Sequence, residues 1–132
     1  MKVAVSSVGQ DLDAQVDPRF GRCAYFLIVD TDTMAFEVMD NPAAGAAGGA
    51  GIQAGQTVAN AGAQAVLTGN VGPNAFQTLS SMGLKIYTGL SGTVREAMEQ
   101  FKQGTLKEVT AATVGSHFGM GRGGRGGGRW QR

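Results

Sequence analysis

The sequence predicts an α/β protein with a mixed sheet of about five strands and helices on both faces, in the order βββαβαβα. Two observations support this prediction. From Ile52 onward, short apolar runs alternate with helical patterns, which is typical of parallel strands joined by right-handed crossovers. Nearer the N-terminus, two β-rich runs are separated only by the turn Asp30–Thr33, which favours a hairpin and therefore an antiparallel strand.

The strands are predicted from short apolar runs that end in turn-forming residues. Val3–Val5 is the first, and the two runs of the hairpin follow it. The five predicted strands are Val3–Val5, Tyr25–Val29, Ala35–Met39, Ala65–Leu67 and Leu84–Tyr87. Leu106–Val114 fits either a further short strand or an ordered arm, and the sequence pattern does not decide between them.

Three helices are predicted between and after these strands. Ile52–Ala61 ends near a glycine, and the second helix starts at Pro73, which suits the first helical position. The third helix has a capping box, with Thr93 as N-cap and Glu96 three residues later. Gly104 fits its C-terminal end.

Charge is distributed unevenly along the chain. The 132 residues carry 11 basic and 10 acidic side chains, for a net charge of +1. Four of the arginines and no acidic residue lie between Gly119 and Arg132, so the remainder is acidic overall and does not resemble a nucleic-acid binder. Since Gly/Arg-rich sequence buries too little apolar surface to offset ordering entropy, we predict a domain at 1–117 and a disordered tail at 118–132.

Cysteine content and hydropathy indicate a cytoplasmic protein. Cys23 is the sole cysteine, which excludes an internal disulfide and an all-cysteine metal site and fits a reducing compartment. The segment Met1–Ser6 is strand-like and too short for a signal peptide. No apolar run approaches the roughly 18 residues of a membrane span. We therefore expect no membrane association.

Small residues follow the predicted strands at the carboxyl edge of the sheet, where ligands bind in open α/β sheets. Such loops offer backbone N–H groups, and those that enter helices add the positive end of the helix dipole, so they suit an anion. Glycine-rich turns are also an ordinary way to join strands to helices, and none of these loops matches a P-loop or a dinucleotide fingerprint. The candidate binding residues here are Ser6, Gly69, Asn70, Gly72, Gly89, Ser91 and Gly92.

Catalytic groupings are absent from the sequence pattern. His117 is the only histidine, and it lies at the border of the predicted tail, where a catalytic triad could hardly recruit it. The first strand carries no acid that could hold a catalytic metal ion. Asp11, Asp13 and Asp17 lack the remaining spacing of a calcium loop and fit a solvated acidic loop. We therefore predict that the protein is not an enzyme.

Cys23 allows two interpretations. A lone cysteine is commonly a small buried hydrophobic residue. This one follows Arg19 and Arg22, whose positive charge would lower its pKa and favour a metal-binding thiolate. With His117, it is the candidate metal ligand of the chain.

The sequence resembles the dinitrogenase iron–molybdenum cofactor biosynthesis family over roughly Lys2–Val109. The resemblance rests on motifs that occur in the family's order. They are Asp17–Phe26 with its Phe-Gly-Arg, Asn41–Pro42 followed by an Ala/Gly loop and Gly51–Ala54, Thr68–Phe76, Tyr87–Gly89, and Ser91–Ala97.

The resemblance implies a three-layer, ribonuclease-H-like fold without nuclease activity, and a carrier or chaperone of a metal–sulfur cofactor. Some members take part in iron–molybdenum cofactor assembly, and others, similar to the orange protein of sulfate-reducing bacteria, hold a molybdenum–copper sulfide cluster non-covalently. It implies cofactor assembly or acceptor proteins as partners of a monomer. Arg19, Arg22 and Asn41 join the candidate binding residues on this ground.

Two functional hypotheses follow. The first is non-catalytic binding, storage or delivery of a preformed anionic cluster, either molybdenum–iron or molybdenum–copper sulfide, held without covalent attachment. One cysteine and one histidine are too few to ligate a conventional iron–sulfur cluster, so backbone N–H groups and arginines would hold it. The alternative is an interaction module whose Gly/Arg tail binds nucleic acid or an acidic protein. Four arginines predict weak binding, so we do not expect nucleic acid as the main partner. Removal of Gly119–Arg132 separates the two hypotheses.

Overall fold

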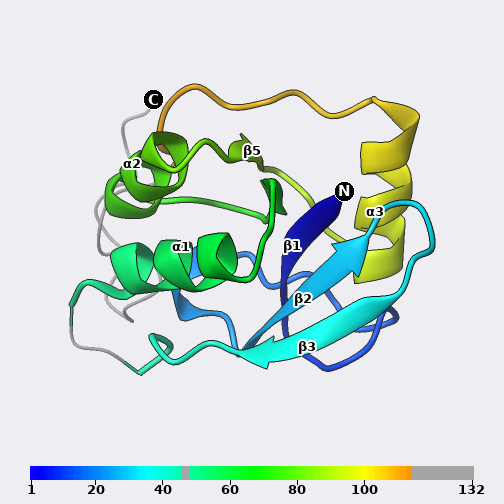
Figure 1. Cartoon of the computed structure of the whole chain (residues 1–132), viewed down its shortest axis with the longest axis horizontal. Helices are drawn as coiled ribbons and strands as arrows, with labels where there is room; N and C mark the ends of the chain where they lie inside the picture. Colours follow the sequence, from blue (N-terminus) through cyan, green and yellow to red (C-terminus); the bar gives the residue numbers. More distant parts are fainter. Residues whose placement is uncertain (46–47, 114–132) are drawn as a thin grey trace.

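A five-stranded mixed sheet forms the centre of the structure, in the order β3-β2-β1-β4-β5 (Figure 1). The computed structural model describes residues 1–45 and 48–113. The central strand β1 pairs antiparallel with β2 and parallel with β4, while β3 and β5 form the two edges. The strands are β1 (Lys2–Ser7), β2 (Tyr25–Asp30), β3 (Phe36–Asp40), β4 (Ala65–Leu67) and β5 (Lys85–Tyr87).

The apolar runs of β1, β2 and β4 are continuous because both faces of the sheet are covered. Val5 pairs with Leu27 of β2 on one side and with Leu67 of β4 on the other, and all three side chains are fully buried. The edge strand β3 is different, since Phe36 and Val38 are each 38% exposed. The most apolar strands therefore lie at the centre, as their sequences dictate.

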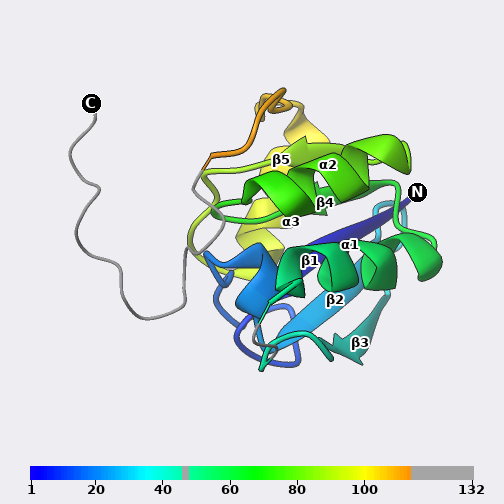
Figure 2. The ribbon, with the colours of Figure 1, turned by 90° about the vertical axis from the view of Figure 1, so that its left-hand side faces the viewer.

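The helices divide into two layers. Helices α1 (Ala50–Asn60) and α2 (Pro73–Ser81) cover one face of the sheet, and α3 (Val94–Gln103) covers the other (Figure 1). Seen from the side, α1 and α2 lie next to each other in front of the strands (Figure 2). Phe26, Val58, Leu79 and Ile86 belong to the core under α1 and α2, whereas Met98 packs in the core under α3.

The predicted three-layer α/β arrangement and the order βββαβαβα are confirmed, and the label ribonuclease-H-like stays a prediction. Two details differ. Helix α1 begins at Ala50, two residues before the predicted start, because Gly49 can adopt the left-handed conformation (φ 73°) of its N-cap. A single 3-10 turn, η1 (Phe20–Arg22), precedes β2, and no periodic pattern predicts an element so short.

The segment after α3 is an ordered arm. Glu108 forms an isolated bridge with Tyr87 of β5, and the Val109 N–H donates to the Ile86 carbonyl over 2.8 Å. Charged and exposed residues on both sides of Val109 explain why pairing does not extend into a strand. The predicted boundary at residue 117 and the predicted disorder of 118–132 lie outside the described residues. In the described part, no helix combines the length and apolarity that crossing a bilayer needs.

The capping box of α3 gives a stability prediction. The Thr93 hydroxyl accepts from the Glu96 N–H (3.1 Å), and the Glu96 carboxylate accepts from the Thr93 N–H (2.9 Å). Thr93→Ala should lower the free energy of unfolding by about 1 kcal/mol in urea titrations. The matched control is Thr57→Ala inside α1, where the hydroxyl bonds only to the carbonyl of Gln53 four residues earlier and loss should be near zero. Equal losses would contradict the capping account.

Candidate functional site

Helices α1 and α2 run parallel and start side by side. A Cβ built on Gly51, the second residue of α1, would lie 3.0 Å from both the Cβ and the N of Ala75 in the first turn of α2. A Cβ on Gly55, one turn later, would lie 2.9 Å from the Thr78 methyl group. Since contacts at both turns join matching positions of the two helices, their N-termini lie together at the carboxyl edge of the sheet.

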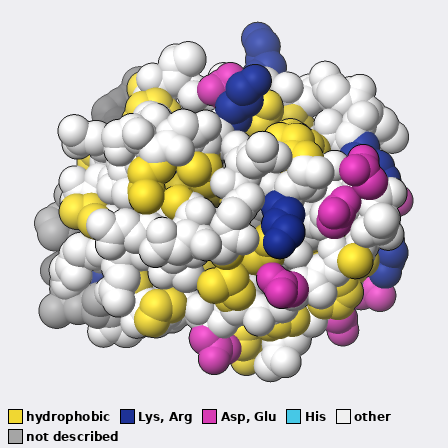
Figure 3. Space-filling view, in the orientation of Figure 1, with side chains coloured by type: hydrophobic (Ala, Val, Ile, Leu, Met, Phe, Trp, Pro, Cys, Tyr) yellow, Lys and Arg dark blue, Asp and Glu magenta, His cyan; other side chains and the backbone are white. Residues whose placement is uncertain are grey.

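Neither α1 nor α2 contains a side chain that compensates the positive dipole end at its own N-terminus. Neither helix has a side-chain N-cap bond, an acidic residue in its first turn, or any charged residue. On the face drawn in Figure 3, no acidic side chain lies over α1 or α2. Parallel dipoles placed side by side concentrate partial positive charge at one end. An anion bound there would interact favourably with both helices.

The start of α3 is different because the protein itself occupies its N–H groups. Val94 and Arg95 donate to the carbonyls of Ala14 (2.9 Å) and Leu12 (2.8 Å), and Glu96 donates to Thr93. The Glu96 carboxylate also compensates the dipole. Gly89, Ser91 and Gly92 lead into this helix and not into α1 or α2, and their role as binding residues stays a prediction. Gly89 donates its N–H to the Gly69 carbonyl over 2.9 Å.

The 3-10 turn η1 brings the two predicted arginines to the same edge. A Cβ on Gly21 would lie 3.2 Å from the Gly51 N, so η1 packs directly against the start of α1. Arg22 donates to the Ala44 carbonyl over 3.3 Å, which aims it along the loop before α1. Arg19 forms an ion pair with the buried Asp17 (3.2 Å) that raises its pKa, and its side chain stays 43% exposed.

The loop that enters α2 is held against η1. Asn70 donates its N–H to the Pro18 carbonyl (2.9 Å) and accepts from the Phe20 N–H (3.4 Å). Gly69 is required here, since a Cβ on it would lie 2.6 Å from the Pro18 Cα. Gly72 then provides the extended N-cap of α2.

Two predicted binding residues shape the site from beneath it. The buried Ser6 hydroxyl bonds to the Asp17 carbonyl and to the Thr68 hydroxyl, both at 2.7 Å. The buried Asn41 amide donates to the Gly21 (3.1 Å) and Cys23 (2.9 Å) carbonyls. The hydrogen-bonding groups of both side chains are thus engaged in holding the loops together.

Cys23 is fully buried, and its thiol donates to the Phe20 carbonyl over 3.3 Å. Burial raises the pKa of this thiol, and the nearby Asp17 carboxylate raises it further. The prediction that Arg19 and Arg22 favour a thiolate is wrong, because Arg19 is paired with Asp17 and the sulfur lies away from water. His117, the other predicted metal ligand, lies outside the described residues.

The predicted residues that the structure brings together are Ser6, Arg19, Arg22, Asn41, Gly69, Asn70 and Gly72. The residues predicted from sequence do not include Gly21, Gly51 and Gly55, which allow η1, α1 and α2 to pack closely. The four-residue spacing of Gly51 and Gly55 is a signal for close helix approach that the pattern offered. Within residues 1–45 and 48–113, no three His, Cys, Asp or Glu side chains form a metal-binding group. The groups at this edge of the sheet are therefore backbone N–H donors and arginine side chains, which suit an anion.

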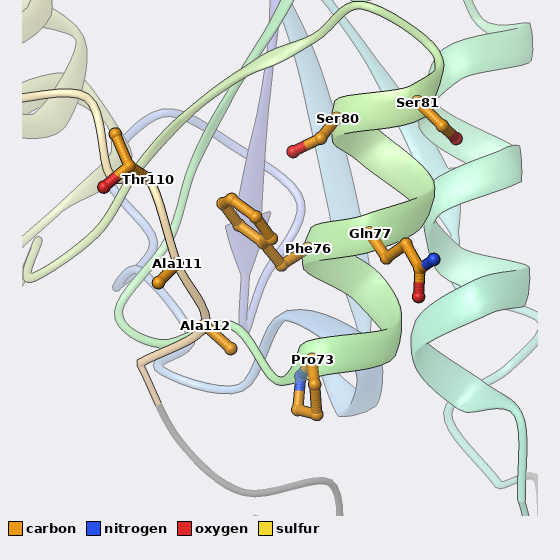
Figure 4. Close-up of a pocket in the computed structure, with 8 residues that line it drawn as sticks. All are labelled: Pro73, Phe76, Gln77, Ser80, Ser81, Thr110, Ala111 and Ala112. Carbon is orange, nitrogen blue, oxygen red and sulfur yellow. The ribbon is translucent and has the colours of Figure 1, made fainter.

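A separate apolar groove of about 630 Å³ lies on the side of α2 that faces away from α1 (Figure 4). Phe76 projects into it from the helix, and Ala111 and Ala112 of the arm form the opposite wall. The groove therefore separates the arm from α2, and Pro73 at the first position of α2 lines one end of it.

Fold and site together define a three-layer α/β protein with two aligned, uncapped helix N-termini at one edge. The chain belongs to the dinitrogenase iron–molybdenum cofactor family, whose model matches residues 1–104. It is similar to the orange protein of Desulfovibrio gigas, solved in its apo form, with 44% identity over 86% of this chain and 96% of that one and a TM-score of 0.83.

Two further proteins are similar over most of their length. A putative NifB protein from Thermotoga is 42% identical over 86% of this chain and 97% of its own, with a TM-score of 0.75. An uncharacterized protein of Methanocaldococcus jannaschii is 27% identical over 112 residues, which are 82% of this chain and 95% of the relative.

Gly69 provides a test of the packing between the two loops. Gly69→Ala should cost about 1–3 kcal/mol of unfolding free energy, because the added methyl group meets the Pro18 backbone. Gly45→Ala is the matched control, since a Cβ there meets nothing within 4 Å. Chemical denaturation of both variants checks this, and a Gly69→Ala protein as stable as the control would refute the close approach.

The buried thiol predicts a pH dependence of stability. Because the folded-state pKa of Cys23 is raised above the unfolded value of about 8.5, its stabilising contribution is complete below that pH and is lost as the pH rises further. Unfolding free energies should therefore fall more steeply between pH 8 and 10 (roughly the onset of thiol ionisation) in the wild type than in Cys23→Ala. Parallel curves would show that the thiol ionises equally in both states.

Proposed function

We propose that this protein binds and carries a preformed, anionic metal–sulfur cluster that contains molybdenum, and that it does so without catalysis. The cluster is cargo, held non-covalently at the start of α1 and α2. The observation that carries the proposal is the pair of parallel, uncharged and uncapped helix N-termini in contact beside Arg22.

The physical basis is charge complementarity. A helix N-terminus stabilises an anion by about 0.3–1 kcal/mol when exposed and by up to about 2 kcal/mol when partly buried. Two such ends act together here, with N–H donors from the first turn of each helix. Arg22 adds positive charge beside them, whereas the charge of the half-exposed Arg19 is largely balanced by its ion pair with Asp17. A sulfide-rich polyanion fits such a set, because its outer atoms accept hydrogen bonds and need no free protein ligand.

The comparisons support this choice among anions. The family is described by the iron–molybdenum cofactor, and the orange protein of Desulfovibrio gigas shares 44% identity with this chain. Both point to a cofactor-binding or carrier role. The buried position of Cys23 favours non-covalent binding, since its sulfur already bonds to Phe20. Cofactor assembly and acceptor proteins are the partners that such a carrier would meet, and the cytoplasm is where we expect it.

The direct test is uptake of a synthetic cluster precursor. Anaerobic protein incubated with tetrathiomolybdate and copper should take up molybdenum stoichiometrically and show a sulfide-to-metal charge-transfer band. Arg22→Gln should raise the Kd by about tenfold or more, since a bond to a charged group is worth about 1.5–3 kcal/mol. The control is Lys85→Gln, which also removes one positive charge. Lys85 lies at the amino end of β5, whereas the proposed site lies at the carboxyl edge of the sheet.

The two variants separate a local effect from net charge. If Arg22→Gln and Lys85→Gln weaken binding equally, the arginine acts only through the overall charge of the protein. No uptake by the wild type, either of thiomolybdate with copper or of iron–molybdenum cofactor extract, would refute the carrier function for this chain.

A further inference from the structure

Thr113 connects the C-terminal arm to the loop that enters α2. The Val71 N–H donates to the Thr113 hydroxyl over 2.8 Å, and the Thr113 N–H donates to the Val71 carbonyl over 2.8 Å. The Thr113 hydroxyl also lies 3.2 Å from that carbonyl. One residue, 42 positions away in sequence, thus satisfies both backbone groups of Val71, whose side chain is only 1% exposed.

Asn70 and Val71, the two residues before the N-cap of α2, are held by hydrogen bonds from two sides, an arrangement that we call the clamp. On one side, Asn70 bonds to the Pro18 carbonyl and the Phe20 N–H. On the other side, Thr113 bonds to Val71, and the arm is held in register because Val109 donates to Ile86. The next residues are Gly72, the N-cap of α2, and Pro73, its first residue. The direction in which α2 starts is therefore fixed from both sides.

We infer that Thr113 is a positioning residue for the proposed cargo site, an inference that rests on the proposed function. The Thr113 hydroxyl accepts a hydrogen bond from the Val71 N–H, so this donor is satisfied in the present conformation of the loop. The first-turn N–H groups of α2 stay aligned with those of α1 as a result. Without the hydroxyl, the Val71 N–H has to find water, which moves the loop at the point where the helix begins.

Thr113 is exposed, so it can be substituted without disturbing the core. Thr113→Val removes the hydroxyl and keeps the shape and the backbone bond, whereas Thr113→Ser restores the hydroxyl. Thr110→Val makes the same change three residues earlier on the arm, at an exposed threonine beside the groove of Figure 4. All three proteins are studied as the full chain.

Two readouts are needed. Amide hydrogen exchange measures protection of the Val71 N–H, and titration with tetrathiomolybdate plus copper measures the Kd. Thr113→Val should raise both the Val71 exchange rate and the Kd by roughly three- to tenfold, the range that one hydrogen bond supports. Thr113→Ser should restore both values, and Thr110→Val should leave both unchanged.

The outcomes distinguish the positioning role of Thr113 from the carrier function on which it rests. Unchanged Val71 protection in Thr113→Val overturns the clamp, whatever the wild type binds. Lost protection with an unchanged Kd overturns the positioning role and leaves the carrier function intact. If the wild type takes up no cluster, the carrier function fails, and with it the positioning role, even where exchange confirms the hydrogen bond.

Discussion

The close parallel packing of α1 and α2 is the constraint on which the rest of the site depends. Gly51 and Gly55 allow it, since any larger side chain would meet Ala75 or Thr78 at 3.0 Å or less. Packing two positive dipole ends together is unfavourable unless something negative lies near them. Neither helix supplies an acidic residue for this purpose, so the fold leaves the charge available to a ligand. If a cluster binds here as we propose, stability and binding are opposed at this edge.

The helix N-termini on the two faces of the sheet differ in which groups surround their first N–H groups. The α3 layer is self-sufficient, because a capping box and the carbonyls of Leu12 and Ala14 occupy its first N–H groups. The α1 and α2 layer instead depends on neighbouring loops, with η1 packed against Gly51 and the arm bonded to Val71. Residues from four separate parts of the chain thus determine the geometry of one small region.

Much of the fold could be predicted from local sequence, and the site only in part. Apolar runs, Pro73 and the Thr93–Glu96 capping box are local signals, and each gave the correct element. The hydrogen bonds of that capping box occupy the start of α3, and they favour the starts of α1 and α2 over Ser91 and Gly92 as the anion site. The environment of Cys23 depends on which residues fold over it, and charges adjacent in sequence, such as Arg19, were neutralised by a partner. Thr113 has no local signal at all, since its role comes from a contact 42 residues away.

The central claim is that an anionic cluster binds where α1 and α2 begin, and anomalous diffraction tests it most directly. Crystals grown with tetrathiomolybdate and copper, measured at the molybdenum absorption edge, would locate the metal without assumptions about ligands. The account predicts an anomalous peak beside the first turns of α1 and α2, on the side of Arg22. A peak at the start of α3 or against the edge strand β3, with none at the aligned N-termini, would contradict it.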